Sequence, residues 1–266
     1  MTQTETAQLG KWWGEFDLPN EQWCLWEIGP MALYVKRSLA ELHLAWLQGD
    51  DPLEQRADWL QQVDEKPNLD GYEQSRFVFE QSSHRFNLGL RLADRSIIVR
   101  PEVPLCVPAG ESTTLFVSTA LWVCPSMQAS TLLELPLYRS SDTWFGQNTI
   151  SGELCYMTKS RARTEYTDSI NYSHRAITEI KIRNSSDKTV RIDRIRVPVK
   201  NLALYEDSSG RFQTDTLLLS VFSNEKDTKM EILELKQQLD DLALVASPRL
   251  PIESGIIHQT FAKLFE

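Results

Sequence analysis

The chain has 266 residues, of which 41% are hydrophobic and 24% are charged, and its formal net charge is −9. These values are typical of a globular protein with an ample core, and they exclude an intrinsically disordered chain. The negative charge lies in residues 1–150, whereas residues 151–266 carry as many basic as acidic groups. The N-terminal half is therefore expected to repel nucleic acid.

No apolar run approaches the roughly 18 residues that a transmembrane helix requires. The first residues, MTQTETAQLGKWW, are polar and contain no basic region followed by an apolar one, as a secretory signal would. We therefore expect a cytoplasmic protein without a membrane span.

The four cysteines are too far apart in sequence for the close pairs of a zinc site. In a reducing compartment they are expected to be buried free thiols rather than disulfides. The sequence thus implies no metal and no cofactor. The cysteines are Cys24, Cys106, Cys124 and Cys155.

The segment from Trp12 to Gln48 is rich in tryptophan and consists of short apolar runs separated by turn residues. Runs such as CLWEI and ALYVKR have the length of strands. Residues Leu39–Leu47 fit either a strand or a short helix, and we favour the strand. Closely spaced tryptophans most often form a core, and an aromatic ligand site is the alternative.

A helix is predicted at Leu53–Val63. Asp51 is a suitable N-cap, Pro52 suits the first helical position, and Glu54 falls in the first turn. Apolar residues three and four positions apart would then share one face of the helix.

Residues 76–123 are predicted to be entirely β. The longest run, TTLFVSTALWV at residues 113–123, has apolar residues on both faces and predicts a central strand of a sandwich. Residues 132–137 predict another short strand. The polar, aromatic-containing stretch at residues 138–152 is predicted to be a loop.

The clearest strand pattern runs from Ala176 to Tyr205, AITEIKIRNSSDKTVRIDRIRVPVKNLALY. Isoleucines alternate with charged residues in its first half, as on a strand with one buried face. A turn at residues 184–187 leads to a second apolar run, whose phase slips by one residue at 193–194, as in a β-bulge. We predict an antiparallel hairpin that ends, or lies at a sheet edge, at Pro198.

This stretch, preceded by WFG at residues 144–146 and GELCY at residues 152–156, resembles an uncharacterised prokaryotic family known as a domain of unknown function. The resemblance covers roughly residues 76–249. It implies the β-rich layout and brings no activity, cofactor or catalytic residue.

The last third of the chain contains a predicted strand at Leu217–Phe222. Residues 229–245 fit a helix, through a capping-box pattern at Thr228 and Glu231, or further strands, which we favour. A closing helix is predicted at Ser254–Phe265.

These patterns together predict a mostly β protein with two antiparallel β-sandwich-like domains and one or two minor helices. The predicted domains are residues 1–148 and residues 149–266. Because sandwiches serve many unrelated functions, this fold class does not select one.

One constellation of residues is a candidate ligand site. Aromatic residues in a glycine-flanked loop stand near basic residues that alternate at a period of two, which suits an anionic or planar ligand. A solvated sheet face with a self-anchored loop is the other interpretation, and the tryptophan-rich segment is the next candidate site. The ligand-binding candidates are Arg139, Trp144, Phe145, Lys159, Arg161 and Arg163.

Known catalytic signatures are absent from the sequence, including glycine-rich phosphate loops, H-E-x-x-H, G-x-S-x-G and C-x-x-C. We therefore expect a non-enzymatic binding or protein-interaction module whose partner is a protein or a small polar ligand. One alternative is an enzyme or binder acting on a small anionic or carbohydrate-like ligand at the loop 139–163. The other is weak nucleic-acid binding through the basic stretch 159–200.

Overall fold

The computed structural model of the chain describes residues 11–63, 66–80, 83–101, 103–146, 152–158, 163–166, 172–223, 228–235, 241–251 and 256–258. Most of these residues form β-strands, which confirms the predicted fold class. The described ranges contain no α-helix; a 3-10 turn, η2 (Val199–Asn201), follows strand β18. No helix within these ranges is long and apolar enough to cross a membrane.

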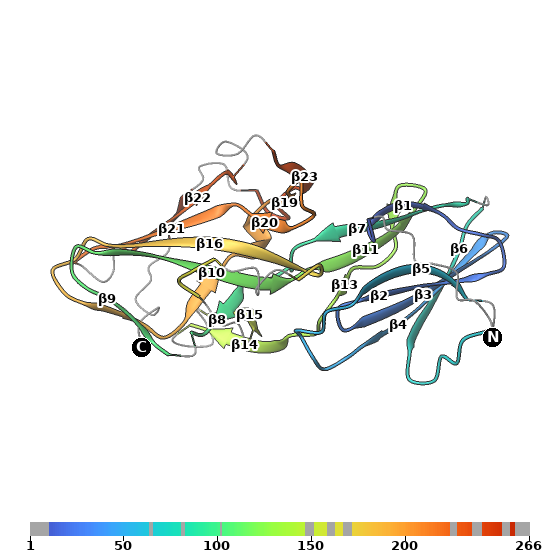
Figure 1. The fold of residues 1–266 in the computed structure, drawn as a ribbon, viewed down its shortest axis with the longest axis horizontal. Coiled ribbons are helices and arrows are strands. Elements are labelled where there is room, and N and C mark those ends of the chain that lie inside the picture. The colour runs from blue at the N-terminus through green and yellow to red at the C-terminus, as the bar shows by residue number, and fades with distance from the viewer. Residues whose placement is uncertain are drawn as a thin grey trace. The chain divides into compact units, whose positions relative to one another are not determined.

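The chain divides into two compact units, each built from two stretches of sequence. Unit 1 comprises Met1–Arg91 and Leu121–Arg139, and unit 2 comprises Leu92–Ala120 and Ser140–Glu266. The single boundary after residue 148 stays a prediction from the sequence. Figure 1 shows the strands of both units.

Unit 1 contains an antiparallel sheet that we call the meander sheet, with the strand order β5-β2-β3-β4-β6. Its middle strands are consecutive in sequence, which confirms the strands predicted in the tryptophan-rich segment and the strand preferred at residues 39–47. The strands are β2 (Trp23–Ile28), β3 (Met31–Ser38), β4 (Glu41–Gln48), β5 (Ala57–Val63) and β6 (Glu73–Val78).

The second sheet of unit 1, the companion sheet, has the order β1-β7-β11-β12, and β13 also pairs with β11. The strand predicted at residues 132–137 corresponds to β13. The strands are β1 (Gly14–Asp17), β7 (Arg85–Arg91), β11 (Trp122–Met127), β12 (Ser130–Thr131) and β13 (Leu135–Pro136).

Aromatic side chains pack the two sheets of unit 1 against each other. The Trp26 ring of β2 lies 5.3 Å from the Phe16 ring of β1 and 5.7 Å from the Phe86 ring of β7. Trp26 is 1% exposed and Phe86 is fully buried. Each buried ring removes a large apolar area from water, so these contacts form the centre of a sandwich core.

The helix predicted at residues 53–63 is wrong, because Ala57–Val63 form strand β5. The expected N-cap bond exists, with the Leu53 amide donating to Asp51 Oδ1 at 2.9 Å, but it closes a turn. Strand β5 then pairs with β2 along its whole length. Inter-strand hydrogen bonds to an already formed edge therefore override the local helix signals.

The main sheet of unit 2 is mixed, with the order β23-β19-β20-β16-β21-β22-β24 and β10 paired to β16. Strand β16 is antiparallel to β10 but parallel to β20 and β21, a pairing that the sequence did not predict. The strands are β10 (Ser112–Ala120), β16 (Arg175–Asn184), β19 (Leu204–Glu206), β20 (Phe212–Thr214), β21 (Thr216–Val221), β22 (Lys229–Leu233), β23 (Ala243–Ala246) and β24 (Ile256–His258).

Unit 2 also contains a four-stranded sheet of order β14-β15-β8-β18 and the antiparallel pair β9 and β17. The strands are β8 (Ile97–Val99), β9 (Leu105–Val107), β14 (Ser141–Phe145), β15 (Glu153–Thr158), β17 (Val190–Ile192) and β18 (Ile195–Val197).

The single long strand predicted at residues 113–123 is interrupted at Leu121. Residues before it form β10, which pairs with β16, and residues after it form β11, which pairs with β7. Leu121 itself is fully buried. Because apolar periodicity continues through this point without glycine or proline, the sequence carries no signal for the break.

The hairpin predicted at residues 176–205 has the right strands and the wrong pairing. Strand β16 pairs with β10, β20 and β21, whereas β17 pairs with β9 and β18 with β8. The phase slip at residues 193–194 is therefore the point where the chain leaves one sheet for another. Strand β18 ends before Pro198 at the edge of its sheet, as predicted.

Asn184 explains why the turn after β16 does not close a hairpin. Its buried side-chain amide donates to the carbonyl oxygens of Val107, Pro108 and Lys188 at 2.8–2.9 Å. Its Oδ1 accepts hydrogen bonds from the amide and the hydroxyl of Ser186. These bonds tie the turn to the end of β9.

The C-terminal strands agree in part with the sequence. Strand β21 confirms the strand predicted at residues 217–222, and β22 and β23 confirm strands within 229–245. The helix predicted at residues 254–265 is wrong at residues 256–258, which form β24 paired with β22. The rest of that predicted helix lies outside the described residues.

A partly buried ion cluster joins the strands of the four-stranded sheet. Glu153 of β15 accepts hydrogen bonds from Ser96 at 3.0 Å, from Lys200 at 2.8 Å, and from Arg196. Arg196 is 5% exposed and Ser96 is fully buried. Burial alone would raise the pKa of Glu153, but the hydrogen bond from Lys200 and the charge of Arg196 outweigh burial and hold the pKa below its ordinary value.

The buried apolar residues of strands β16 and β18 are expected to dominate the stability of unit 2. Ile182 and Ile195 are at most 1% exposed, so Ile182→Ala and Ile195→Ala should each lower the free energy of unfolding by about 2–5 kcal/mol. Lys181 is partly exposed and forms an ion pair with Glu179, so Lys181→Ala should change it by about 0.5 kcal/mol or less. Urea denaturation measures all three, and equal small losses would contradict the burial of the isoleucines.

The lowered pKa of Glu153 predicts acid sensitivity. Its stabilising charge is fully present above the ordinary glutamate pKa of about 4.3, and the stabilisation is lost as the pH falls through the lower pKa of the folded state. Glu153→Gln should be less stable than the wild type near neutral pH, because it leaves Arg196 without a counter-charge. As the pH falls through the acidic range, the free energy of unfolding of Glu153→Gln should fall less steeply than that of the wild type. Parallel curves in urea denaturation at stepped pH would refute this role.

Candidate functional site

A pocket of about 850 Å³ lies on the outer face of the meander sheet, opposite the sandwich core. Its floor comes from β2, β3, β4 and β6, and one wall comes from residues 66–70, which precede β6. Residues 21 and 22, before β2, complete the rim. All of these segments belong to unit 1.

The floor of the pocket is a row of side chains placed by strand register. Trp23 of β2 is opposite Lys36 of β3, Lys36 is opposite His43 of β4, and His43 is opposite Arg76 of β6. Directly opposed residues share one face of a sheet. Four residues spread over more than fifty positions of sequence therefore stand side by side.

His43 is held in place at the centre of this row. Its ring lies 5.1 Å from the Trp23 ring, and its Nε2 is 3.2 Å from Gln74 Oε1 on β6. Trp23 is 7% exposed, because it also packs edge-on against Tyr34 at 6.3 Å. The imidazole is thus a positioned polar group backed by an aromatic ring.

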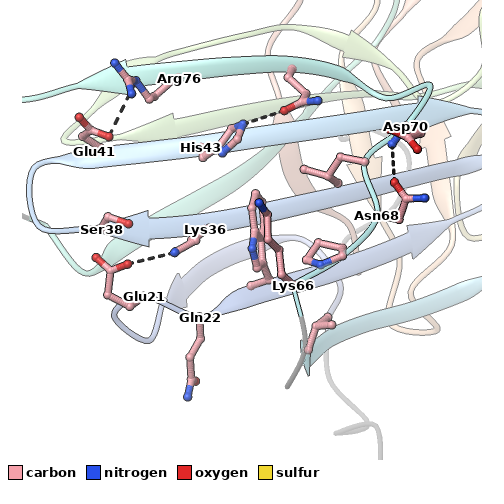
Figure 2. Close-up of a pocket in the computed structure, with 15 residues that line it drawn as sticks. Glu21, Gln22, Lys36, Ser38, Glu41, His43, Lys66, Asn68, Asp70 and Arg76 are labelled. Atoms are coloured by element: carbon pink, nitrogen blue, oxygen red, sulfur yellow. Dashed lines mark hydrogen bonds and ion pairs between the residues drawn. The ribbon is translucent and has the colours of Figure 1, made fainter.

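The two cations of the row form ion pairs with carboxylates near one end of the pocket, as Figure 2 shows. Lys36 Nζ lies 3.0 Å from Glu21 Oε2, and Arg76 Nε lies 3.8 Å from Glu41 Oε2. Hydrogen bonds from Lys36 and Ser38 lower the pKa of the Glu21 carboxyl below its ordinary value. Glu21 is therefore a permanent anion near neutral pH.

Glu21 has a backbone conformation that is unusual for a residue other than glycine, with a φ of 61°. Its amide donates to the Arg37 carbonyl at 2.8 Å, which fixes the segment before β2 against β3. Left-handed conformations of such residues occur mostly where the surrounding structure enforces them, and they cluster at ligand sites. The strained position lies at the pocket rim, beside Lys36.

The opposite end of the pocket is formed by the segment before β6 (Figure 2). The Asp70 amide donates to Asn68 Oδ1 at 3.0 Å, and the Tyr72 amide donates to the Leu69 carbonyl at 3.1 Å. Gly71 has a φ of 82°, which a glycine adopts without strain. The Tyr72 ring then packs on the Tyr34 ring at 5.5 Å and anchors the segment to the sheet.

The candidate residues named from the sequence lie elsewhere. Trp144 and Phe145 are on strand β14 rather than in a loop, because residues 141–145 pair with β15. Trp144 is 44% exposed, and the Arg194 guanidinium lies 5.3 Å from the Phe145 ring. Arg139 is exposed and is the last residue of unit 1, whereas β14 belongs to unit 2.

The basic residues of that candidate site are only partly described. Arg163 forms an isolated backbone bridge with Phe116 of β10, in the mixed sheet. Lys159 and Arg161 lie outside the described residues. A shared site for these residues with Trp144 and Phe145 stays a prediction.

Sequence reasoning did not identify the pocket, although part of its signal was present. A two-residue turn at Leu39-Ala40 places Lys36 opposite His43 once β3 and β4 are taken as a hairpin. The two-residue turn at Gly29-Pro30 likewise places Trp23 opposite Lys36, whereas the pairing of β4 with β6 is not readable in the same way. The tryptophan-rich segment, named as the second candidate, does contribute Trp23.

The cysteines differ in their exposure. Cys24, Cys124 and Cys155 are buried as predicted, but Cys106 is exposed on β9. Burial raises the pKa of the Cys24 and Cys155 thiols to about 11, which makes them unreactive. Within the described part of the chain, no group of three or more His, Cys, Asp or Glu side chains is arranged to hold a metal ion.

Comparison with known proteins identifies a family without revealing a function. The chain belongs to the family described as "Protein of unknown function (DUF432)", which matches residues 12–266. The resemblance expected for residues 76–249 is thus confirmed and extends over nearly the whole chain. Searches of curated proteins and of solved structures find no match.

Proposed function

We propose that this member of a family of unknown function is a non-enzymatic cytoplasmic binding module that holds a small polar ligand in the pocket of the meander sheet. One observation carries the proposal: strand register brings Lys36, His43 and Arg76 into one row on the floor of a cavity of about 850 Å³. Ligand pockets typically have volumes of about 300–1,000 Å³ and a few convergent polar groups.

The electrostatics of Glu21 suit ligand binding better than the role of a general acid. A general acid needs a carboxyl whose pKa is raised toward the working pH. The pKa of Glu21 is lowered instead, by Lys36 and Ser38. A carboxylate that stays charged suits a fixed hydrogen-bond acceptor.

The four free thiols support a cytoplasmic location. Four free cysteines are expected where glutathione and thioredoxin keep thiols reduced. The exposed Cys106 would be prone to oxidation outside such a compartment.

The loop 139–163 supports a second candidate, an enzyme or binder acting on an anionic or carbohydrate-like ligand. The observation in its favour is the exposed indole of Trp144 on β14. A planar or sugar-like ligand can stack on an exposed indole.

Nucleic-acid binding through residues 159–200 has less support. Arg175 and Arg196 are at most 5% exposed. Lys181, Arg191 and Lys200 form ion pairs with carboxylates of the chain itself. Five of the nine described basic side chains of this stretch are therefore buried or paired within the chain, which weakens the case for contacts with phosphates.

A thermal-shift screen of small polar molecules on the wild type and on pocket variants tests the proposal. Saccharides, carboxylates, phosphates, amino acids and nucleosides cover the relevant chemistry. A ligand at about a hundred times its Kd should stabilise the wild type by about 2.7 kcal/mol, which raises Tm by several degrees. His43→Ala and Gln74→Ala should reduce this shift, because they remove the central polar groups of the floor.

Matched controls come from the same unit. His84→Ala and Gln55→Ala remove the same side chains from exposed positions outside the pocket and should keep the full shift. The Arg161→Ala, Arg163→Ala double variant tests the loop 139–163. A ligand whose shift disappears in that folded double variant, but persists in His43→Ala and Gln74→Ala, would refute the pocket and favour the second candidate.

A further inference from the structure

We infer that the pocket of the meander sheet binds an uncharged short oligosaccharide, an inference that rests on the proposed binding function. Its grounds are the charge balance of the lining, the chemistry of its polar groups, and their spacing across the sheet.

The charged groups of the pocket cancel. Among the described residues that line it, as many carry a carboxylate as carry a lysine or arginine side chain. Lys36 is paired with Glu21 and Arg76 with Glu41, at 3.0 and 3.8 Å. At both ion pairs, a charged ligand of either sign would meet a group of its own sign beside the opposite one, so these pairs discriminate against both signs.

The neutral lining groups donate and accept hydrogen bonds. Gln22, Asn68 and Gln74 present amides and Ser38 presents a hydroxyl, groups that both donate and accept. The oxygens of Asn68 and Gln74 are already bonded to the Asp70 amide and to His43, so these two side chains offer mainly their NH2 donors to a ligand. A sugar hydroxyl likewise donates one hydrogen bond and accepts two. A ligand dense in hydroxyl groups can therefore satisfy amides, carboxylates and cations at once, whereas an apolar or purely accepting ligand cannot.

Apolar lining is present but small, which also suits a saccharide. Trp23 forms part of the floor with only 7% of its surface exposed, and Val63, Pro67 and Leu69 line the wall. Such narrow apolar strips can cover the C–H face of a sugar ring. They are too limited for a lipid or a large aromatic ligand, whose affinity depends on extensive apolar burial.

The spacing of the floor groups suits a molecule of more than one ring. Lys36, His43 and Arg76 lie on three adjacent strands, which are about 4.8 Å apart. Hydroxyl groups on opposite sides of one sugar ring span one such spacing, so a row that crosses two spacings, about 9.6 Å, suits more than one ring. The cavity of about 850 Å³ lies near the upper end of the usual range for ligand pockets, about 300–1,000 Å³, and exceeds the needs of a monosaccharide.

The test is a glycan array, followed by titration calorimetry on its best neutral ligand. The wild type, His84→Ala and Gln55→Ala should bind a neutral oligosaccharide with equal affinity. His43→Ala and Gln74→Ala should each bind it about tenfold more weakly, the loss expected for one hydrogen bond in a pocket. Gln74 is exposed on its strand, so Gln74→Ala keeps the test valid if His43→Ala fails to fold.

Charged analogues of the same oligosaccharide measure the discrimination. Replacing one sugar by a uronic acid or an amino sugar should weaken binding about tenfold or more, because either charge meets a like charge in the lining. The affinity for the neutral ligand should change less than about twofold when the salt concentration is raised, since no ionic contact with the ligand is screened.

The outcomes separate this inference from the proposed function. Equal or tighter binding of a charged analogue that still depends on His43 and Gln74 would overturn the uncharged class and leave the pocket standing. Failure of every glycan to bind, with a non-sugar ligand detected in the pocket by thermal shift, would overturn the oligosaccharide and leave the pocket standing. Glycan binding that both pocket variants leave unchanged would overturn the pocket, and with it both conclusions.

Discussion

The register of the meander sheet is the constraint on which the candidate site depends. Trp26 points inward and packs against Phe16 and Phe86 at 5.3 and 5.7 Å, while Lys36 and His43 point outward. A shift of one residue would exchange the two faces and place charged groups in the core. Burial of the aromatic face therefore fixes, on the other face, the row of polar groups that forms the pocket floor. Core packing and the pocket floor are consequences of the same alternation.

The polar groups of the two units differ in what they contact. In unit 2, Asn184 and Glu153 are surrounded by partners from the chain itself, so their hydrogen-bonding capacity is used in joining strands. In unit 1, Lys36 and Arg76 are paired with carboxylates on the floor of an open cavity, and the imidazole of His43 is held between Trp23 and Gln74. Side chains fixed in this way lose little conformational freedom when a ligand arrives, which is the basis of preorganised binding.

The backbone conformation of Glu21 is a further unusual feature of the pocket rim. Glu21 adopts a left-handed conformation that glycine would adopt without strain, yet a carboxylate is present there and reaches Lys36. The ion pair is exposed, and exposed pairs contribute little to stability. The pair therefore adds little to fold stability, and its carboxylate lies at the rim of the pocket.

What the sequence determined by itself is the kind of element and its buried face. Period-two alternation depends on neighbours two residues apart, so the strands at residues 23–48, the burial of Ile182 and Ile195, and the mostly β class were all readable. Pairing was decided only by the tertiary structure, because a strand bonds to whichever edge is available, at any distance along the chain. For that reason β5 replaced a predicted helix, β16 paired with β10 and β21 rather than with β17, and the long run at residues 113–123 divided at Leu121. The pocket belongs to both classes: two-residue turns align Trp23, Lys36 and His43, but only the tertiary structure pairs β6 with β4 and adds Arg76 to the row.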